Sequence, residues 1–358
     1  MHFELTLRNM KAIIIIFCTN GIKPFTRREL ANTGCGRTTA FLSRKKDSFL
    51  RKKRRIAKMK KRIAVLLTAL MIFSLSACGK EEPSQETGSE TFPMTVTDYL
   101  GTEMEFEAAP EKIVSLSPSC TEILYALGLD DKMVGVSNWC TYPEEAAGVE
   151  KVGDTYSVNV EKIIELDADV VFVSGAAAAE SVEALNASGI RVYSIGAKNI
   201  DDIYASIENI GTITETGDKA KQVVSGMKDE LADLEKKVSE LETKSVFIDL
   251  GSLYSTGSED YLGTSLALIK ADNIALDAGA NSPQLSAETV IEKNPQVYIA
   301  MTSKEEFEQP AGFEEIDAFK NGEVYFIAYD DPATDMISRD GPRFIQGLDY
   351  LADLIHKL

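Results

Sequence analysis

Histidine is nearly absent from this 358-residue chain, which contains only His2 and His356. We expect His2 to be removed with an N-terminal leader, so the mature chain keeps one histidine. A single histidine near the C-terminus cannot complete a Ser-His-Asp or Cys-His catalytic site, nor a zinc or manganese site built from several histidines. The sequence therefore predicts no catalytic residues of these kinds, no metal site and no resident cofactor.

Long apolar runs are also missing near the N-terminus. The run at residues 63–75 is shorter than the roughly 20 residues that a stable membrane-spanning helix needs. It follows four basic residues (Lys58, Lys60, Lys61 and Arg62) and leads through small residues into Cys78. This order is typical of a signal peptide, whereas a short transmembrane anchor is the disfavoured alternative. We predict that residues 59–77 are a lipoprotein signal peptide and that Cys78 is lipidated, as in the lipoproteins that this pattern resembles.

The segments on either side of the signal peptide have different characters. Residues 1–58 carry a basic block at 51–55 and fit no part of the export pattern, so we interpret them as an upstream extension before a start at Met59. A cytoplasmic or DNA-binding arm, the alternative, conflicts with export of everything downstream. From Gly79 to Thr91 the chain has no aliphatic or aromatic residue. We therefore predict that residues 78–92 are a lipid anchor and flexible tether.

Basic residues are scarce after the signal peptide. Residues 1–77 hold 18 of the 38 Lys and Arg residues but 3 of the 56 Asp and Glu residues, so residues 78–358 carry 20 basic and 53 acidic ones, a net charge of −33. Such a surface repels nucleic acids and anionic lipid head groups, and it promotes solubility. We expect no nucleic-acid partner and a membrane contact only through the lipid on Cys78.

Two cysteines, Cys120 and Cys140, remain after Cys78. Outside the membrane they could form one disulfide, but a pair of small buried thiols is equally compatible with the sequence.

The rest of the chain is typical of an α/β protein with two lobes. Residues 160–173 and 287–300 form a weak internal repeat, in which each copy has the pattern of a short helix, a turn and an apolar strand. Short apolar runs alternate with helical patterns, which predicts a helix-flanked parallel sheet in each lobe. The predicted strands are residues 113–117, 133–136, 170–174 and 192–195 in the first lobe and 245–250, 297–301 and 324–329 in the second.

Residues 219–241 have apolar side chains at spacings of three and four, which predicts one long helix between the lobes. A coiled-coil dimer is an alternative use of this stripe. We favour a helix that packs across both lobes and limits hinge opening. The predicted segments are a first lobe at residues 93–210, a linking helix at 211–243 and a second lobe at 244–358.

Eight short motifs over residues 93–358 resemble the ABC-transporter substrate-binding proteins for iron-siderophores, cobalamin and haem. The motifs are residues 96–101, 112–124, 134–136, 142–143 and 151–153, the two repeats, and Ser338-Arg339-Asp340-Gly341-Pro342-Arg343. The resemblance implies a class III substrate-binding protein on the extracytoplasmic face of the cell membrane. It implies no enzyme activity, but a transport ligand and, as partner, an ABC permease dimer with its ATPase.

The loops after the strands are where an open parallel sheet binds ligands. There, Ser119 and Glu122 have the spacing of a capping box, with the helix N-terminus facing the ligand. Trp139 and Tyr156 are aromatic side chains suited to a large flat ligand, whereas for Tyr142, beside Pro143, we favour loop anchoring. We predict ligand contacts at Ser119, Trp139 and Tyr156.

The resemblance adds further residues in the second lobe. In cobalamin-type relatives an Asp and an Arg four residues apart face the ligand, and Asp335 and Arg339 match that spacing. Arg343 matches a structural arginine, and Tyr254 lies in a corresponding loop. The resemblance also implies that Glu161 and Glu288, one in each repeat, dock onto permease arginines. A pair of solvated glutamates favoured by their helix dipoles is the alternative.

The ligand favoured by the sequence is a corrinoid of the cobalamin type. A ferric siderophore is the main alternative, but such anionic ligands need several cleft cations, and only Arg339 and either Lys198 or Arg343 are candidates. Haem ranks third because no cleft histidine is expected, although a tyrosine could serve as its ligand. An extracytoplasmic enzyme with paired carboxylates is the alternative from another class, and only scattered carboxylates favour it.

Overall fold

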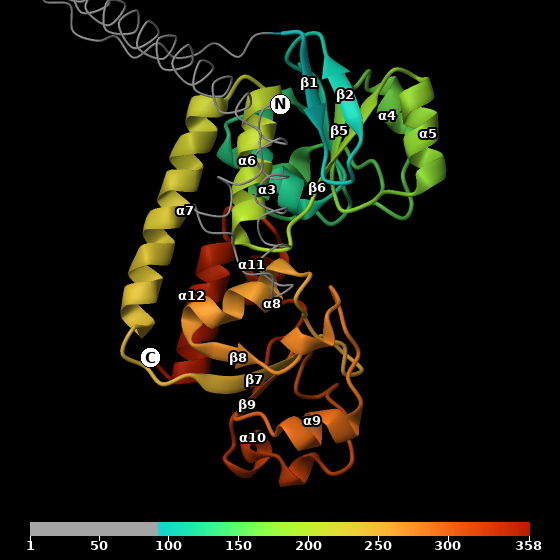
Figure 1. The fold of residues 1–358 in the computed structure, drawn as a ribbon. Helices are drawn as coiled ribbons and strands as arrows, with labels where there is room; N and C mark the ends of the chain where they lie inside the picture. The colour runs from blue at the N-terminus through green and yellow to red at the C-terminus, as the bar shows by residue number, and fades with distance from the viewer. Residues whose placement is uncertain (1–91) are drawn as a thin grey trace, which may run out of the picture. The chain divides into compact units, whose positions relative to one another are not determined.

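The computed structural model describes residues 92–358, which belong to one compact unit (Figure 1). The predictions for residues 1–58, 59–77, the tether up to residue 91 and Cys78 lie outside the described residues. None of the helices in the described part is long and apolar enough to cross a membrane.

The first lobe is built on a parallel sheet with the order β4-β3-β5-β6. Its strands are β3 (Ile113–Ser115), β4 (Met133–Val136), β5 (Val170–Ser174) and β6 (Arg191–Ile195). Its helices are α3 (Pro118–Ala126), α4 (Val160–Glu165), α5 (Ala179–Ala187) and α6 (Ile200–Ile213). An antiparallel hairpin of β1 (Met94–Thr97) and β2 (Glu103–Phe106) precedes the sheet, and the sequence did not predict it.

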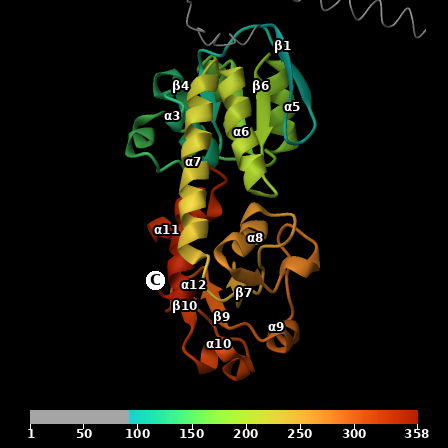
Figure 2. The ribbon, with the colours of Figure 1, turned by 60° about the vertical axis from the view of Figure 1, so that its left-hand side comes forward.

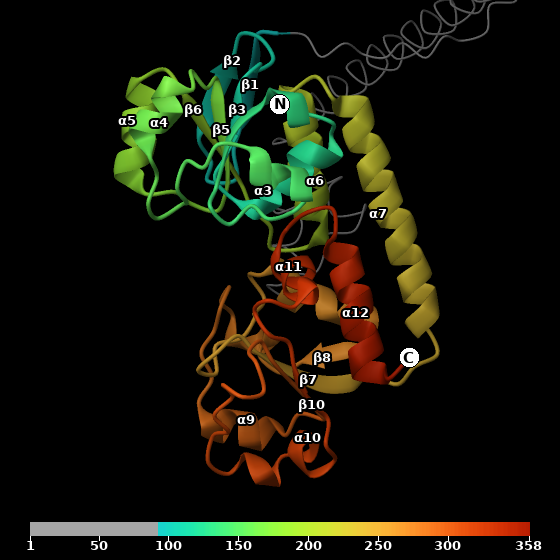
Figure 3. The ribbon, with the colours of Figure 1, turned by 180° about the vertical axis from the view of Figure 1, so that it is seen from behind.

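Successive side chains of β5 point to opposite faces of the sheet, and each face packs in a core of its own. Val170 and Phe172 pack in the same core as residues of α3 and α6. Val171 and Val173 pack in a second core with Ile163 of α4 and with α5. A strand that is covered on both faces must be apolar at every position, which is the reason such runs predict parallel strands. Figure 3 shows α4 and α5 on one side of this sheet and α3 and α6 on the other.

The second lobe repeats this design with the sheet order β10-β9-β7-β8. Its strands are β7 (Lys244–Asp249), β8 (Ala271–Asn273), β9 (Val297–Ala300) and β10 (Val324–Phe326). Its helices are α8 (Tyr261–Ser265), α9 (Ala287–Lys293), α10 (Asp317–Lys320), α11 (Pro332–Ser338) and α12 (Phe344–His356). Short 3₁₀ turns occur at Asp130–Lys132, Glu144–Gly148, Leu266–Ile269, Leu276–Ala278 and Phe313–Glu315. The prediction of two parallel-sheet α/β lobes is confirmed.

The long helix α7 (Gly217–Val238) connects the two sheets along the chain. It packs against α6 of the first lobe and α12 of the second, as Figure 2 shows. Five residues of its apolar stripe are buried in the core that both lobes share: Ala220, Val224, Met227, Leu234 and Val238. This stripe is therefore covered by the chain itself, as the packing hypothesis expects, rather than left free for a coiled coil.

The predicted strands are all present, with small differences at their ends. β3 ends at Ser115, two residues earlier than predicted, because Ser117 is the N-cap of α3 and Pro118 opens that helix. The two copies of the internal repeat form α4 with β5 and α9 with β9, so the helix, turn and strand pattern is confirmed in both.

Candidate functional site

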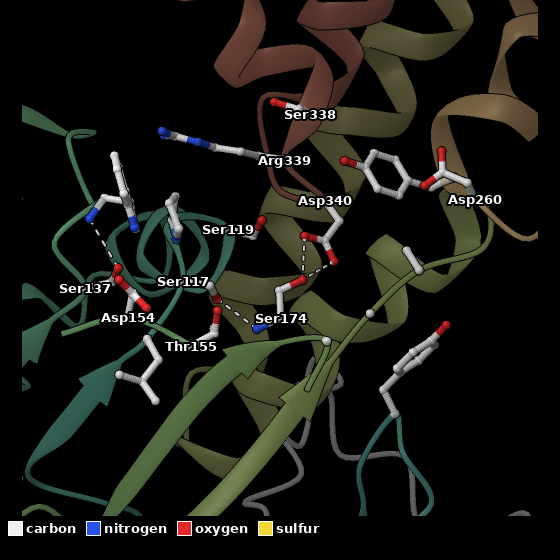
Figure 4. A pocket seen from close by; sticks show the side chains of 18 of the residues that line it. Ser117, Ser119, Ser137, Asp154, Thr155, Ser174, Asp260, Ser338, Arg339 and Asp340 are labelled. Carbon is white, nitrogen blue, oxygen red and sulfur yellow. Dashed lines mark hydrogen bonds between the residues drawn. The ribbon is translucent and has the colours of Figure 1, made fainter. Parts of the chain in front are cut away.

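A cavity of about 560 Å³ opens where the carboxyl ends of the first-lobe strands meet the second lobe (Figure 4). Every strand of the first sheet contributes the residues that follow it, which is the position expected for a ligand site in an open parallel sheet. The first lobe supplies Tyr99, Leu116, Ser117, Pro118, Ser119, Ser137, Trp139, Asp154, Thr155, Tyr156, Ser174, Gly175, Gly196 and Ala197. The second lobe supplies Asp260, Tyr261, Asn281, Ser338, Arg339 and Asp340.

Serine hydroxyls organise the loops at the carboxyl ends of the first sheet. Ser117 Oγ accepts a hydrogen bond of 2.8 Å from the backbone N–H of Ser174, which ties the end of β5 to the start of α3. Ser137 Oγ accepts one of 3.2 Å from the backbone N–H of Trp139 and so shapes the loop after β4. The first turn of α3 therefore lies at the cavity wall, as predicted.

The capping box predicted for Ser119 and Glu122 is wrong. Because Pro118 occupies the first helical position, the N-cap is Ser117 and Ser119 lies inside the helix. Glu122 does not turn back to the helix start. Its side chain is 2% exposed and is bound by two arginines that lie more than 200 residues later in the chain.

These arginines, Arg339 and Arg343, join the segment after α11 to the first lobe. Arg343 donates from Nε to Glu122 Oε2 at 2.8 Å and from Nη2 to Oε1 at 2.6 Å, which is a bidentate pair. Arg339 donates from Nη1 to Glu122 Oε1 at 2.7 Å and lies 2.6 Å from Asp335 Oδ1 through Nη2. Charge-assisted, two-point contacts of this kind fix orientation as well as distance. We call Glu122, Asp335, Arg339 and Arg343 the interlobe clasp.

Asp340 makes a second contact between the lobes at the floor of the cavity. Its two carboxylate oxygens each lie 3.0 Å from Ser174 Oγ, and Ser119 also donates to it. Burial raises the pKa of this carboxyl above its ordinary value, although the serine hydrogen bonds oppose that shift. These hydrogen bonds join the segment after α11 to the end of β5 and the start of α3 at the cavity floor.

The opposite side of the cavity is formed by Asp260 and its neighbours. Asp260 caps α8 by accepting from the backbone N–H groups of Leu262 and Gly263 at 2.9 and 3.2 Å, and it also accepts from Thr256. Burial raises the pKa of Asp260 as well. Beside it, Lys198 of the first lobe pairs with Glu259 of the second at 2.5 Å. The lobes are thus joined by ion pairs at two separate places.

Three exposed aromatic side chains, together with the half-buried Tyr261, give the cavity its apolar contact surface. Trp139 is 66% exposed and Tyr156 is 92% exposed, although both line the cavity. Tyr99 is a third, which the sequence did not predict because it lies in the turn between β1 and β2, outside the parallel strands. The backbone N–H of Tyr99 donates a hydrogen bond to Ser194 O at 2.9 Å. Its ring packs directly on Gly196: a Cβ atom at that glycine would lie only 2.5 Å from Tyr99 Cδ1, so a larger residue would displace the ring. Large aromatic groups left exposed beside a cavity are typical of ligand contacts.

The structure brings some of the predicted ligand residues together and leaves others apart. Ser119, Trp139, Tyr156 and Arg339 all line the cavity. Tyr254 is not among the residues that line the cavity, and its backbone forms an isolated antiparallel β-bridge with Gln284. Asp335 does not line the cavity either, and its carboxylate pairs with Arg339.

Tyr142 also lies outside the lining set. Its ring stacks under the Arg343 guanidinium at 3.7 Å, which is the structural anchoring expected for it.

Glu161 and Glu288 occupy equivalent positions away from the cavity. Each is exposed in the first turn of its helix, Glu161 in α4 and Glu288 in α9. The two helices are capped alike, since Asn159 accepts from Lys162 N and Ser286 Oγ from Thr289 N, both at 3.1 Å.

Cys120 and Cys140 are both buried free thiols in the structure. Of the two alternatives, a disulfide or a pair of buried thiols, the structure has the pair of thiols. Burial raises the pKa of both thiols, and Thr121 Oγ1 donates to Cys140 Sγ at 3.0 Å. Within residues 92–358 no group of three or more His, Cys, Asp or Glu side chains is placed to hold a metal ion.

Comparison with known proteins adds evidence that is independent of this geometry. The sequence profile of a family described as "Periplasmic binding protein" matches residues 113–330. The chain is 38% identical to an "uncharacterized ABC transporter substrate-binding lipoprotein YvrC" of Bacillus subtilis, over 83% of this chain and 98% of the relative. It is 26% identical to a "cobalamin-binding protein" of Halobacterium salinarum, over 82% of this chain and 83% of the relative.

A solved structure also resembles the fold closely. It is a protein of Staphylococcus epidermidis described as a "possible" iron-binding, periplasmic solute-binding protein, with a TM-score of 0.62 and 28% sequence identity. The match covers 69% of this chain and 99% of that protein.

Proposed function

The chain belongs to the periplasmic binding protein family, and we propose that it captures a corrinoid outside the membrane and delivers it to an ABC importer. At the coarser level it is a substrate-binding protein of the importer family for cobalamin, siderophores and haem. Members of this family are transport components, not enzymes. Lipid attachment at Cys78 is part of the proposal, in keeping with the lipoprotein name of the Bacillus subtilis relative.

The cavity between the lobes is the observation that carries the ligand proposal. It has the volume of a small-molecule site, and it combines exposed aromatic faces with a row of hydroxyl groups. A corrinoid offers matching surfaces, because its macrocycle is flat and apolar while its edge carries amide groups. Trp139 and Tyr156 stand exposed beside the cavity, so they extend the contact surface for a ligand that is larger than the enclosed volume.

The names of the relatives support this ligand class and also its main competitor. Two relatives from Halobacterium salinarum strains are named cobalamin-binding proteins, and proteins from Yersinia species are named vitamin B12-binding proteins. The Staphylococcus epidermidis structure is described as possibly binding iron, which keeps a ferric siderophore as the alternative. Haem ranks below both, since among the described residues His356 is the one histidine and it contacts Ile269 O rather than the cavity.

Glu161 and Glu288 supply the proposed docking contacts with the permease. Both carboxylates are exposed, both open a short helix, and they occur at equivalent points of the two lobes. One carboxylate on each lobe suits bidentate pairing with one arginine on each half of a permease dimer. Because neither lines the cavity, docking and ligand binding use separate surfaces.

Direct binding measurements test the ligand assignment. The mature chain is titrated with cyanocobalamin, with ferric siderophores and with haem, and Trp139 fluorescence reports occupancy. We expect cyanocobalamin to bind at micromolar concentration or tighter. Binding of a siderophore alone would contradict the corrinoid assignment while leaving the solute-binding role in place.

A further inference from the structure

We infer that the cavity discriminates by charge: it rejects anionic ligands, and Asp154, Asp260 and Asp340 set this preference. The inference rests on the proposed solute-binding function and adds the charge class of the solute. It separates neutral or cationic complexes from the polyanionic ferric complexes that the same fold could otherwise accept.

Within residues 92–358, the cavity lining offers no positive charge that is free to meet an anion. Of the described residues that line it, Arg339 is the only basic one. Its guanidinium is 11% exposed and is engaged by two carboxylates, Glu122 at 2.7 Å and Asp335 at 2.6 Å. A ligand anion would therefore have to compete with two protein carboxylates for one cation.

The two nearest candidates outside the lining set are also paired. Lys198 binds Glu259 at 2.5 Å, and Arg343 is bound bidentately by Glu122. Both cations had been candidates for siderophore recognition on sequence alone. The structure uses each of them to join one lobe to the other.

Negative charge, in contrast, is built into the wall on several sides. Asp154 lies on the loop after β4, Asp260 at the start of α8 and Asp340 at the floor. Each carboxylate is locked by protein donors: Asp154 by the N–H groups of Tyr156 and Ser157, both at 2.9 Å, and the other two by the contacts described above. These hydrogen bonds hold each carboxylate at the cavity wall.

The consequence is an electrostatic penalty for anions. An anion that leaves water needs donors or cations in return, and like charges across an interface are costly. Neutral amide groups can use the serine and threonine hydroxyls of the wall without such a cost. The cavity therefore favours a neutral, amide-rich or a cationic solute over a ferric tricatecholate.

A matched pair of corrinoids tests this directly. Cyanocobalamin is compared with its monocarboxylate derivatives, in which one peripheral amide has been hydrolysed to a carboxylate, so that charge changes while size hardly does. We expect the derivatives whose acid group enters the cavity to bind about tenfold more weakly at low salt, which corresponds to about 1.4 kcal/mol. The difference in affinity between cyanocobalamin and these derivatives should become smaller as salt is added, because screening weakens the repulsion.

Two double variants locate the effect. Asp154→Asn with Asp260→Asn keeps an acceptor oxygen for the loop and cap hydrogen bonds but removes two charges from the wall. This double variant should reduce the difference in affinity between the two corrinoids. Glu230→Gln with Glu235→Gln removes two charges from the exposed face of α7 and should leave this difference unchanged. Equal binding of the two corrinoids, or a difference that both double variants change alike, would overturn the inference.

A second ligand pair separates this inference from the corrinoid assignment. If cyanocobalamin does not bind, that assignment fails, and the cationic trihydroxamate ferrioxamine B is then compared with a trianionic ferric tricatecholate. Binding of ferrioxamine B alone would support charge discrimination without a corrinoid. Preferential binding of the tricatecholate would overturn charge discrimination, whatever the corrinoids do.

Discussion

Arg343 holds Glu122 through two hydrogen bonds of 2.8 and 2.6 Å, although the residues lie in different lobes and 221 positions apart. The pair is nearly buried, with the Glu122 side chain 2% and the Arg343 side chain 15% exposed. It connects the lobes at α3, while α7 connects them through its packing against α6 and α12. This arrangement agrees with the limited hinge opening expected from a single long connecting helix.

Removing the Glu122 charge should destabilise the protein. Glu122→Gln leaves Arg339 and Arg343 without their shared carboxylate, and breaking a buried pair costs about 3–5 kcal/mol. We expect the free energy of unfolding in urea to fall by an amount near the lower end of that range. Glu315→Gln is the control, because its pair with Lys320 is exposed and should contribute less than about 1 kcal/mol. Equal effects of the two substitutions would show that the clasp contributes no more than a surface pair.

Trp139 should report and strengthen ligand binding. Its indole is exposed at the cavity, so ligand contact should quench its fluorescence, and Trp139→Ala should weaken binding by roughly 1–3 kcal/mol. Tyr329→Ala, which truncates an exposed aromatic residue outside the lining set, serves as the control. Unchanged affinity in Trp139→Ala would assign the indole to loop structure.

Asp340 should make stability depend on pH in an unusual direction. Its pKa is raised by burial, so the folded protein holds the proton more tightly than the unfolded chain. Its ionised form therefore lowers stability above the folded-state pKa, and this loss disappears as the pH falls toward the ordinary value of 3.8. We expect wild type to gain stability relative to Asp340→Asn as the pH is lowered in a urea-unfolding series.

Asp277 serves as a control in the same series, because its contribution to stability should change with pH in the opposite direction. Lys293 lowers the pKa of Asp277, so the favourable contribution of that pair is lost as the pH falls. Wild type should therefore lose stability relative to Asp277→Asn on acidification. The account of Asp340 fails if its difference curve is flat or follows that of Asp277.

Docking should depend on Glu161 and Glu288 while ligand binding does not. Replacing both with Ala should abolish uptake, because each exposed carboxylate loses its proposed permease arginine. Replacement with Arg should weaken binding to the permease more than Ala does, because like charges then meet. Glu183→Ala with Glu314→Ala removes one exposed charge from each lobe and should leave uptake intact. Normal uptake by the Glu161 and Glu288 double variant would defeat the docking proposal.

Lipidation at Cys78 is testable without reference to the described residues. Expression from Met59 should yield an acylated, membrane-anchored protein, and Cys78→Ala should be released or remain unprocessed. A Cys78→Ala protein that is still acylated and anchored would show that the signal-peptide interpretation is wrong.

The strands and the long helix could be predicted because their signals are local. The first four residues of β5 are apolar because both faces of that strand are covered, and α7 repeats its apolar residues at helical spacing. The loops after the strands then pointed to Trp139 and Tyr156. Ser119 was also placed at the cavity, although for a capping role that Pro118 excludes.

The remaining features depend on contacts between distant parts of the chain. The arginines that bind Glu122, Arg339 and Arg343, follow α11 and lie far from Glu122 in the sequence. The sequence showed only that Glu122 lies three residues after Ser119, which is the spacing of a capping box. Tyr99 enters the cavity wall from a hairpin outside both sheets, where only the absence of a side chain at Gly196 makes room for it. Such contacts follow from how the elements approach one another, which periodicity does not report.

The most direct test of the central claim is uptake of cobalt-labelled cyanocobalamin by the source cells. We expect loss of this gene to reduce uptake at limiting concentration to background, and the intact chain to restore it. Unchanged corrinoid uptake, together with loss of ferric siderophore uptake in the same cells, would contradict the account.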